Sequence, residues 1–357
     1  MSKTLTEAAK GRGALGNPDN RFEHHSRESV DDGWDNLEQP PERIRTTLTV
    51  DSAKTVISYN RSPDVPFDRS INPYRGCEHG CVYCFARPTH AWLGLSPGLD
   101  FESRLFYKPD AAALLRTELN KKNYRCAPIA LGINTDAYQP VERKLGLTRE
   151  LLKVLLEYRH PVTLVTKSAL VERDLDLLTE LADHGLIQVA LSITTLERSL
   201  STRLEPRAAA PERRLQTVAK LSAAGIPTSV MVAPLIPVLT DHELEDILSA
   251  ARQAGAGWAG YVLLRLPHEV KELFKGWLSE HAPLKAEHIM KRIRDCRGGQ
   301  EYQAEFGTRM RGEGVFAELL KKRYRLAMKR LAFAGLPELN TTAFRQAADV
   351  KPQLSLF

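Results

Sequence analysis

Apolar and polar positions alternate regularly along the middle of the chain. Between Arg69 and about Leu266, short apolar runs are separated by segments with helical periodicity. The apolar runs predict strands at Ser70–Arg75, Ile129–Ile133, Val162–Val165, Ile187–Ile193, Thr228–Val232 and Gly260–Leu264. The periodic segments predict helices at Val82–Trp92, Thr148–Tyr158, Arg173–Asp183, Glu212–Ala224 and Asp241–Ala254.

This alternation of strand and helix predicts an α/β fold with a parallel sheet, since parallel strands need a helical crossover between them. The six predicted strands are too few for a closed eight-stranded barrel. We therefore expect residues 66–266 to form a curved, partly open, (βα)6 TIM-like barrel.

The flanking regions have different patterns. Residues 1–65 are polar and weakly periodic, which predicts an N-terminal arm with little structure of its own, pinned to the barrel by Phe22 and Trp34. Residues 267–334 predict a helical extension, with helices at His268–Leu278, Lys285–Arg297 and Gly314–Ala334. Residues 335–357 read as a polar linker that ends in a short apolar peptide.

Composition narrows the class of protein. With 357 residues, 43% of them hydrophobic, the chain can bury a large core. It has no apolar run of the length that a membrane span needs, and Met1–Arg12 has no apolar signal region. Three of its five cysteines fall within eight residues, which is unlike a disulfide framework. These features predict a cytoplasmic protein without membrane association.

The formal charge of +6 is unevenly distributed. The segment Lys321–Arg330 holds six basic residues in ten and no acidic one. Such a run attracts polyanions such as nucleic acids, but it is equally typical of a solvated helix face. Charge alone leaves both interpretations open.

The cysteine cluster Cys77-Glu-His-Gly-Cys81-Val-Tyr-Cys84 has the spacing C-x3-C-x2-C. It follows the first predicted strand, at the edge where parallel sheets carry their sites. Three thiolates can ligate three irons of a cubane cluster and leave the fourth iron open for a cofactor. The alternative is a structural zinc site completed by His79 or His90, although the second cysteine pair typical of such sites is missing.

The motif, with Tyr83 as its aromatic residue, resembles the signature of radical S-adenosylmethionine (SAM) enzymes over about Arg69–Leu266. More closely, the chain resembles the spore photoproduct lyase group. The segments that support this resemblance are Val165-Thr-Lys-Ser168, Ser192-Ile-Thr-Thr195, Leu204-Glu-Pro206 and Met231-Val-Ala-Pro234.

The resemblance implies a [4Fe–4S] cluster held by Cys77, Cys81 and Cys84, with SAM as the second cofactor. It also implies that Lys167 and Ser192 bind the SAM carboxylate, that Thr135 binds its amino-acid end, and that the backbone of Tyr83 lies against the adenine. A cation at a strand end suits a carboxylate, although Lys167 could also be an ordinary surface lysine.

The loop after the second predicted strand, Gly132–Glu142, departs from the Gly-Gly-Glu segment of many radical SAM enzymes. Asp136 or Glu142 could bind the ammonium group of SAM in its place, or either could cap the next helix; we favour Asp136 as the SAM ligand. The loop also lacks the hydrogen-donating cysteine of spore photoproduct lyase. Cys126 and Cys296 are expected to lie away from the site.

The chain ends in Gln353-Leu354-Ser355-Leu356-Phe357. This peptide resembles the pentapeptide that binds the bacterial sliding clamp, in which a flexible tether offers apolar side chains to a groove. The alternative is an apolar tail that folds back on its own domain. Independently of the barrel, the peptide points to DNA replication or repair.

Three hypotheses follow from the sequence. The first is a radical SAM enzyme that acts on DNA or another nucleic acid, is recruited by the sliding clamp, and receives electrons from a flavodoxin or ferredoxin. The second is a radical SAM enzyme for a protein or small molecule. The third is a non-catalytic, zinc-stabilised adaptor of the clamp. Metal content would separate the third hypothesis from the other two.

Overall fold

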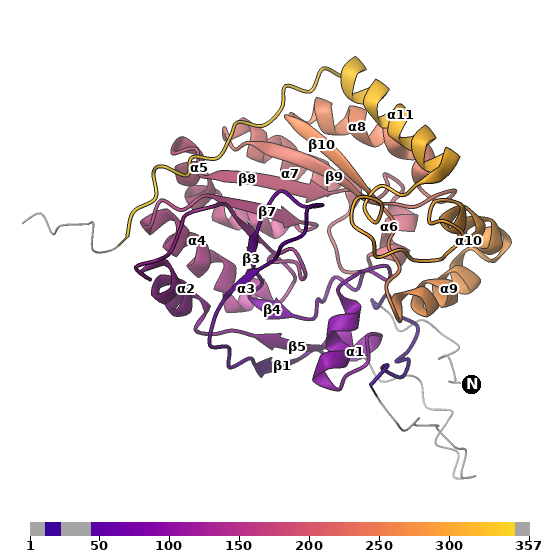
Figure 1. The fold of residues 1–357 in the computed structure, drawn as a ribbon, viewed down its shortest axis with the longest axis horizontal. Helices are drawn as coiled ribbons and strands as arrows, with labels where there is room; N and C mark the ends of the chain where they lie inside the picture. Colours follow the sequence, from indigo (N-terminus) through magenta and orange to yellow (C-terminus); the bar gives the residue numbers. More distant parts are fainter. Residues whose placement is uncertain (1–10, 23–43, 347–357) are drawn as a thin grey trace, which may run out of the picture.

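The computed structural model describes residues 11–22 and 44–346, which contain two β-sheets (Figure 1). The strands are β1 (Thr47–Val50), β2 (Ile57–Tyr59), β3 (Arg69–Ile71), β4 (Tyr74–Arg75), β5 (Arg104–Tyr107), β6 (Ile129–Leu131), β7 (Val162–Thr166), β8 (Ile187–Ser192), β9 (Thr228–Leu235) and β10 (Trp258–Leu263). In the larger sheet the order is β10-β9-β8-β7-β6-β3-β2, and the smaller sheet has the order β1-β5-β4.

The larger sheet forms the predicted partial barrel. From β3 to β10 each neighbouring pair of its strands is parallel, while β2 joins the edge antiparallel to β3. Within the described residues its six parallel strands match the six that the sequence predicts. Its two edges, β10 and β2, do not pair with each other, so the barrel is open as expected.

Helices cover the outer face of this sheet (Figure 1). The α-helices are α1 (Leu99–Ser103), α2 (Ala111–Leu119), α3 (Glu142–Leu145), α4 (Leu147–Glu157), α5 (Leu175–Asp183), α6 (Arg198–Leu204), α7 (Pro211–Ala223), α8 (Leu244–Gln253), α9 (Val270–His281), α10 (Ala286–Asp295) and α11 (Gly314–Arg330). Shorter 3₁₀ helices are η1 (Arg87–Leu93), η2 (Ala169–Asp174), η3 (Asp241–Glu243) and η4 (Pro283–Lys285). The main core lies between sheet and helices and contains fully buried residues such as Leu131, Leu155 and Val189.

Two local predictions were wrong. The strand predicted at Ser70–Arg75 is divided into β3 and β4, which belong to different sheets. Pro73 lies at the division and has no N–H for a sheet ladder. The helix predicted at Val82–Trp92 is a set of turns followed by η1. Bonds such as Arg87 N–H to the Cys84 carbonyl (3.2 Å) span three residues rather than four, so they produce turns instead of an α-helix.

The N-terminal arm has more structure than its polar pattern predicts. Strand β1 pairs with β5, and β2 pairs with β3, because each adds its backbone donors and acceptors to the edge of a sheet. Phe22 contacts Trp92 with ring centroids 4.5 Å apart, so it does pin this part of the arm to η1. The second predicted anchor, Trp34, lies outside the described residues.

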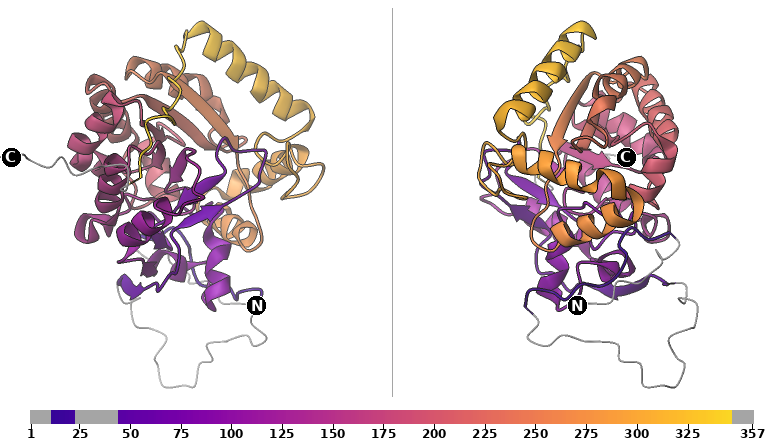
Figure 2. Two further views of the ribbon diagram at one scale, coloured as in Figure 1. Left: turned by 60° about the vertical axis from the view of Figure 1, so that its left-hand side comes forward. Right: turned by 90° about the vertical axis from the view of Figure 1, so that its right-hand side faces the viewer.

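The C-terminal extension contains the three predicted helices, α9, α10 and α11, and Figure 2 shows α11 along the sheet edge formed by β10. After α11 the chain returns across the amino edge of the sheet. There the N–H groups of Gly335, Asn340 and Arg345 donate to the carbonyls of Gly257 (2.8 Å), Gly185 (2.8 Å) and Tyr158 (3.0 Å). The described chain therefore ends on the side opposite the strands' carboxyl ends.

Among the described helices, none combines the length and the apolar character that crossing a membrane requires.

Candidate functional site

The cysteine loop begins immediately after β4, at the carboxyl edge of the sheet. Cys77 and Cys81 are buried and Cys84 is partly buried, and none of the three forms a disulfide. Backbone hydrogen bonds fix the loop: the N–H of Cys77 donates to the Phe101 carbonyl (2.9 Å) and that of Val82 to the Leu204 carbonyl (3.1 Å). The three thiols are thus held on one short, rigid segment.

A fully buried arginine hydrogen-bonds to backbone carbonyls of the cysteine loop. Arg87 donates to the carbonyls of Gly80 (3.1 Å) and Cys81 (2.9 Å), and its guanidinium pairs with the buried carboxylate of Glu102. Both side chains are 0% exposed. Backbone carbonyls are acceptors and cannot hydrogen-bond to one another. A buried guanidinium, which has five N–H donors, can bind several of them at once.

The N-terminal segment is hydrogen-bonded to the same buried glutamate, Glu102. The Glu102 carboxylate accepts hydrogen bonds from the N–H groups of Gly13 (3.0 Å) and Ala14 (2.9 Å). Gly13 lies so close to the cysteine loop that a Cβ at this position would be 1.8 Å from the Gly80 carbonyl oxygen. The segment around Gly13 and Ala14 therefore packs against the cysteine loop.

The chemistry of the three thiols fits an iron–sulfur cluster. Burial raises the pKa of Cys77 and of Cys84, and raises that of Cys81 to about 12; the neighbouring cysteine thiols add to the effect at Cys77 and Cys81. Buried thiolates this close together need a positive partner, which a ligated cluster supplies. In the described residues no three His, Cys, Asp or Glu side chains converge on one metal ion. Ligands of three different irons are not expected to converge on one point.

Each of the two histidines of the alternative zinc site has a contact through one ring nitrogen. His79 Nδ1 lies 3.2 Å from the Asp136 carboxylate. His90 Nε2 contacts the Arg104 carbonyl at 3.0 Å, and burial lowers the pKa of its ring to about 4. The buried Nδ1 of His90 has no hydrogen-bond partner among the described residues, and a ring bonded through one nitrogen can still ligate a metal through the other, so metal content has to decide between the two kinds of site.

Thr135 and Asp136 lie in the loop after β6, next to the first cysteine. The Asp136 carboxylate accepts from Lys167 N–H (2.7 Å), the Thr166 hydroxyl (2.7 Å) and Tyr138 N–H (2.8 Å), in addition to its pair with His79. Burial alone would raise the pKa of Asp136, but His79 and these donors lower it to about 2. The Asp136 backbone also hydrogen-bonds Cys77, which places this anion beside the cysteine loop.

Lys167 and Ser192 end two adjacent strands, and both lie on the same side of the sheet as the cysteines. Lys167 directly follows β7, and its Nζ donates to the Ala233 carbonyl (3.3 Å) and lies 5.9 Å from the centroid of the Tyr83 ring. The positive charge of Lys167 lowers the pKa of Cys81, although burial raises that pKa by a larger amount. Ser192 is the last residue of β8 and is 5% exposed. The structure thus places Asp136 and Lys167 near the thiols and Ser192 at the same edge of the sheet, while their binding of SAM stays a prediction.

Glu205 is a central residue of the site to which the sequence interpretation gave no role. Its carboxylate is fully buried and is bonded to the Tyr83 hydroxyl, the Thr194 hydroxyl (2.7 Å) and the Arg214 guanidinium, with Lys167 Nζ 3.8 Å away. Burial would raise the pKa of Glu205, but Arg214 and Lys167 lower it to about 2. The Leu204-Glu-Pro206 segment entered the sequence analysis only through the family resemblance; a buried carboxylate needs a partner, but the sequence does not show that this one is buried.

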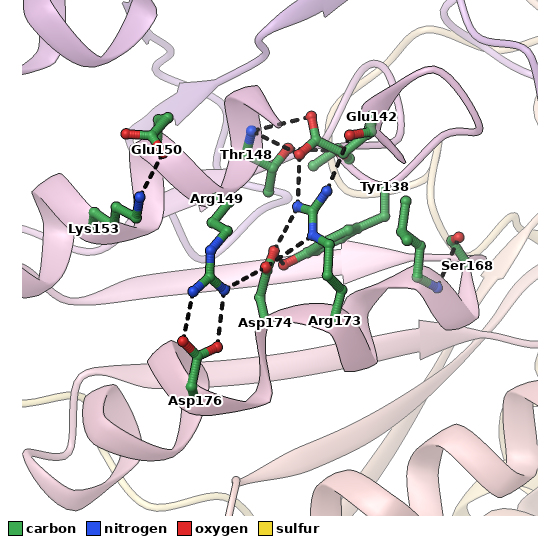
Figure 3. A network of polar contacts seen from close by, with 12 residues as sticks. Tyr138, Glu142, Thr148, Arg149, Glu150, Lys153, Ser168, Arg173, Asp174 and Asp176 are labelled. Carbon is green, nitrogen blue, oxygen red and sulfur yellow. Dashed lines mark hydrogen bonds and ion pairs between the residues drawn. The ribbon is translucent and has the colours of Figure 1, made fainter. Parts of the chain in front are cut away.

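Glu142 has a structural role, as the helix-capping alternative predicts. Its carboxylate accepts from the Thr148 N–H (3.1 Å) at the start of α4 and from Arg173 (2.8 Å). Figure 3 shows these contacts within a wider network in which Asp174 joins Arg173, Tyr138 and Arg149. The network ties α3, α4 and η2 together. It leaves Asp136 as the carboxylate of this loop that contacts the cysteine segment.

The two remaining cysteines lie where the sequence places them. Cys126 precedes β6 and is therefore at the amino edge, opposite the cysteine loop. Cys296 follows α10 and is buried in the main core.

In the basic segment, Arg323 is paired with Glu245 (2.6 Å) and Lys321 with Glu318 (2.9 Å), so part of its charge is neutralised within the protein.

The fold is shared with solved structures of spore photoproduct lyase. A variant of that enzyme with bound AdoMet and dinucleoside spore photoproduct superposes with a TM-score of 0.58 at 15% identity, covering 80% of both chains. Another variant superposes with a TM-score of 0.57 at 17% identity, again over 80% of each chain.

Sequence comparison gives the family. An uncharacterized protein of Mycobacterium tuberculosis is 36% identical over 265 residues, which are 74% of this chain and 76% of the relative. One from Methanocaldococcus jannaschii is 31% identical over 191 residues, 54% of this chain and 68% of the relative. The sequence profile of the radical SAM superfamily matches residues 71–251, which contain the cysteine loop and the ends of β6 to β9. The cysteines, the open barrel and this match agree: the chain is an enzyme of the radical SAM superfamily.

Proposed function

We propose that Cys77, Cys81 and Cys84 hold a [4Fe–4S] cluster and that SAM binds against it at the carboxyl edge of the sheet. The observation that carries this proposal is that three unbridged thiols, two of them buried and one partly buried, lie near Asp136 and Lys167 at the edge where Ser192 ends β8. In its reduced form such a cluster supplies the electron that splits SAM into methionine and a 5′-deoxyadenosyl radical.

The surrounding residues would orient SAM by charge. Lys167 keeps ammonium donors free, because it makes one hydrogen bond of 3.3 Å and lies 3.8 Å from Glu205; these donors suit the SAM carboxylate, together with the hydroxyl of Ser192. Asp136 would act on the ammonium group through its charge, because its two oxygens already have four partners within the protein. The Thr135 hydroxyl donates to the Tyr74 carbonyl (2.9 Å), so its lone pairs remain available to accept from the same ammonium.

Tyr83 would hold the adenine through its backbone rather than its side chain. Its hydroxyl is committed to Glu205 and lies 3.2 Å from the Thr194 hydroxyl. That anchoring keeps the segment between Cys81 and Cys84 in one conformation, which supports a binding role for its peptide groups. Burial of the site would keep water away from a radical.

The proposed substrate is DNA or another nucleic acid. Support comes from the net charge of +6, from the clamp-like terminal peptide, and from the shared fold with a lyase that binds a dinucleoside photoproduct. The terminal peptide, Gln353–Phe357, lies outside the described residues and would recruit the enzyme to the sliding clamp. A flavodoxin or ferredoxin would provide the electron.

If the substrate is a DNA lesion, the group that returns a hydrogen atom to it must differ from the cysteine that spore photoproduct lyase uses. The Gly132–Asp136 loop has no cysteine, and Cys126 and Cys296 lie elsewhere in the fold. The proposal therefore extends to nucleic-acid modification as well as repair. A protein or small-molecule substrate is the competing possibility.

Anaerobic reconstitution with iron, sulfide and SAM, followed by reduction with dithionite, tests the proposal. Formation of 5′-deoxyadenosine would establish reductive SAM cleavage. Faster formation with damaged DNA than with intact DNA, or a new nucleoside in the digested DNA, would support the substrate class. An active enzyme that DNA and RNA neither stimulate nor consume would favour a protein or small molecule.

A further inference from the structure

Arg265 lies beside Phe85, the residue that follows the third cysteine of the loop, at the carboxyl edge of the sheet. It comes two residues after the end of β10, and its guanidinium carbon is 5.3 Å from the centroid of the Phe85 ring. Phe85 directly follows Cys84 and is 40% exposed. Cys84 is partly buried whereas Cys77 and Cys81 are buried. The Arg265–Phe85 pair therefore lies where the cysteine loop approaches the surface.

The guanidinium of Arg265 has no acidic partner among the described residues. The hydrogen-bond contact of its side chain there joins Nη1 to Met310 Sδ at 3.7 Å, and a thioether sulfur is a weak acceptor. Its buried Nε has no hydrogen-bond partner in the same part of the chain. Since a guanidinium carries five N–H donors, Arg265 keeps donors for an incoming oxyanion.

A second arginine increases the positive charge nearby. Arg297 is buried and donates to the carbonyls of Leu264 (2.8 Å) and Arg309 (2.8 Å), which ties the segment bearing Met310 to the end of β10. Burial, with repulsion from Arg265, lowers the pKa of Arg297 to about 10. An anion bound at Arg265 would relieve this repulsion, whereas the Nη donors of Arg297 are used by carbonyls and its Nε, which has no partner among the described residues, is buried.

We propose that Arg265 binds a backbone phosphate of the nucleic-acid substrate, and that Phe85 holds the guanidinium plane and contacts the neighbouring base. This inference rests on the nucleic-acid substrate of the proposed function. A planar guanidinium pairs with phosphate through two parallel hydrogen bonds, and aromatic rings beside basic side chains are the platforms on which single strands stack. Phosphate binding here would position one nucleotide beside the cysteine loop.

Arg265→Gln and Arg292→Gln form a matched pair for the test. Arg292 also stacks on an aromatic ring, with its guanidinium carbon 5.3 Å from the Phe316 centroid, but it is paired with Asp295 at 3.2 Å. Both changes remove one positive charge. Affinity of the reconstituted enzyme for a fluorescent single-stranded oligonucleotide would be measured by anisotropy over a salt series. Iron content and circular dichroism would show that each variant is folded.

We expect Arg265→Gln to weaken binding by about tenfold or more and to flatten the log–log salt slope by about 0.7, the value for one lost contact to a single strand. Arg292→Gln should change neither. Replacing single phosphates by neutral methylphosphonates should identify one position that matters to the wild-type enzyme and not to Arg265→Gln.

The possible failures are distinguishable. A wild-type enzyme that binds the oligonucleotide with a salt-dependent affinity that Arg265→Gln leaves unchanged would overturn the assignment of Arg265 alone. A folded, iron-loaded wild-type enzyme that binds no single- or double-stranded nucleic acid would overturn both this inference and the proposed substrate. Loss of binding to an acidic peptide instead of an oligonucleotide would reassign Arg265 to a protein substrate.

Discussion

Lys167 Nζ lies 3.8 Å from Glu205 Oε1, and both side chains act electrostatically on the thiol of Cys81. The carboxylate and the ammonium are too far apart for a hydrogen bond, so Lys167 is held near the site without being neutralised by close contact. Glu205 is bonded directly to Arg214 and Tyr83 instead. One buried acid thereby fixes an aromatic residue of the cysteine loop and restrains a candidate cofactor-binding lysine.

Replacing Lys167 tests its role in binding SAM. Lys167→Ala should weaken SAM binding by about 1.5–3 kcal/mol, because one charge-assisted contact to the carboxylate is lost. The absorbance of the cluster should be unchanged, since Lys167 is not a ligand. Isothermal titration of the reconstituted variant with SAM measures the effect. An unchanged SAM affinity would remove Lys167 from the site.

Breaking the Glu205–Arg214 pair should destabilise the protein strongly. Both side chains are almost completely buried, so either Glu205→Gln or Arg214→Gln leaves a buried charge without its partner, at a cost of about 3–5 kcal/mol. The double variant should cost less than the sum of the two single changes. Urea unfolding followed by circular dichroism gives the three free energies.

Glu157→Gln is the control for that experiment. Its partner Arg116 lies 2.8 Å away, but the two side chains are 49% and 44% exposed, so the change should cost less than about 1 kcal/mol. Additive effects of Glu205→Gln and Arg214→Gln would mean that the two groups do not depend on each other.

The cysteine ligands can be tested by metal analysis. We expect about four irons and four sulfides per chain after anaerobic reconstitution. Replacing Cys77, Cys81 and Cys84 together by Ala should abolish iron binding, while Cys126→Ala at the opposite edge of the sheet should not. Stoichiometric zinc without iron after anaerobic purification would contradict the proposal.

Gly13 offers a test of how the N-terminal segment packs against the cysteine loop. Gly13→Ala would place a methyl group 1.8 Å from the Gly80 carbonyl oxygen, so residues 11–22 or the cysteine loop must shift. We expect a loss of about 1–3 kcal/mol in stability and faster bleaching of the cluster in air. Gly16→Ala is the control, because its Cβ would have no atom within 4 Å. Equal bleaching rates in the two variants would show that this segment does not protect the site.

Much of the fold follows from the sequence because its signals are periodic. Strands β6 to β10 are short apolar runs, and a parallel sheet requires the helices that alternate with them. The pattern fails where contacts of a particular side chain, rather than periodicity, decide the conformation. The segment after Cys81 has apolar residues at helical spacing, but Arg87 takes the carbonyls of Gly80 and Cys81, and turns result.

The candidate site residues could be predicted from the sequence where their residue type and their position at a strand end both pointed to a role. Cys77, Asp136, Lys167 and Ser192 all follow or end strands, and the structure brings them to one edge. The roles of Glu205 and Arg214 could not be read in the same way, because their pairing depends on how α7, which packs against β8, lies next to the end of α6. Buried pairs of this kind give no local pattern.

Recruitment by the sliding clamp is the prediction that most narrows the biological role. A synthetic peptide covering Val350–Phe357 should bind the bacterial clamp with a dissociation constant in the micromolar range, about −8 kcal/mol. Leu356→Ala with Phe357→Ala should remove most of that affinity, because two apolar anchors of a short contact are lost. The same double change in the whole enzyme should leave iron content and reductive SAM cleavage intact, since the described chain leaves the barrel at the edge opposite the cysteines. Absence of heat in calorimetry, together with no displacement of a known clamp ligand, would make the peptide a coincidence and leave the proposed nucleic-acid substrate to rest on the net charge and on the fold shared with spore photoproduct lyase.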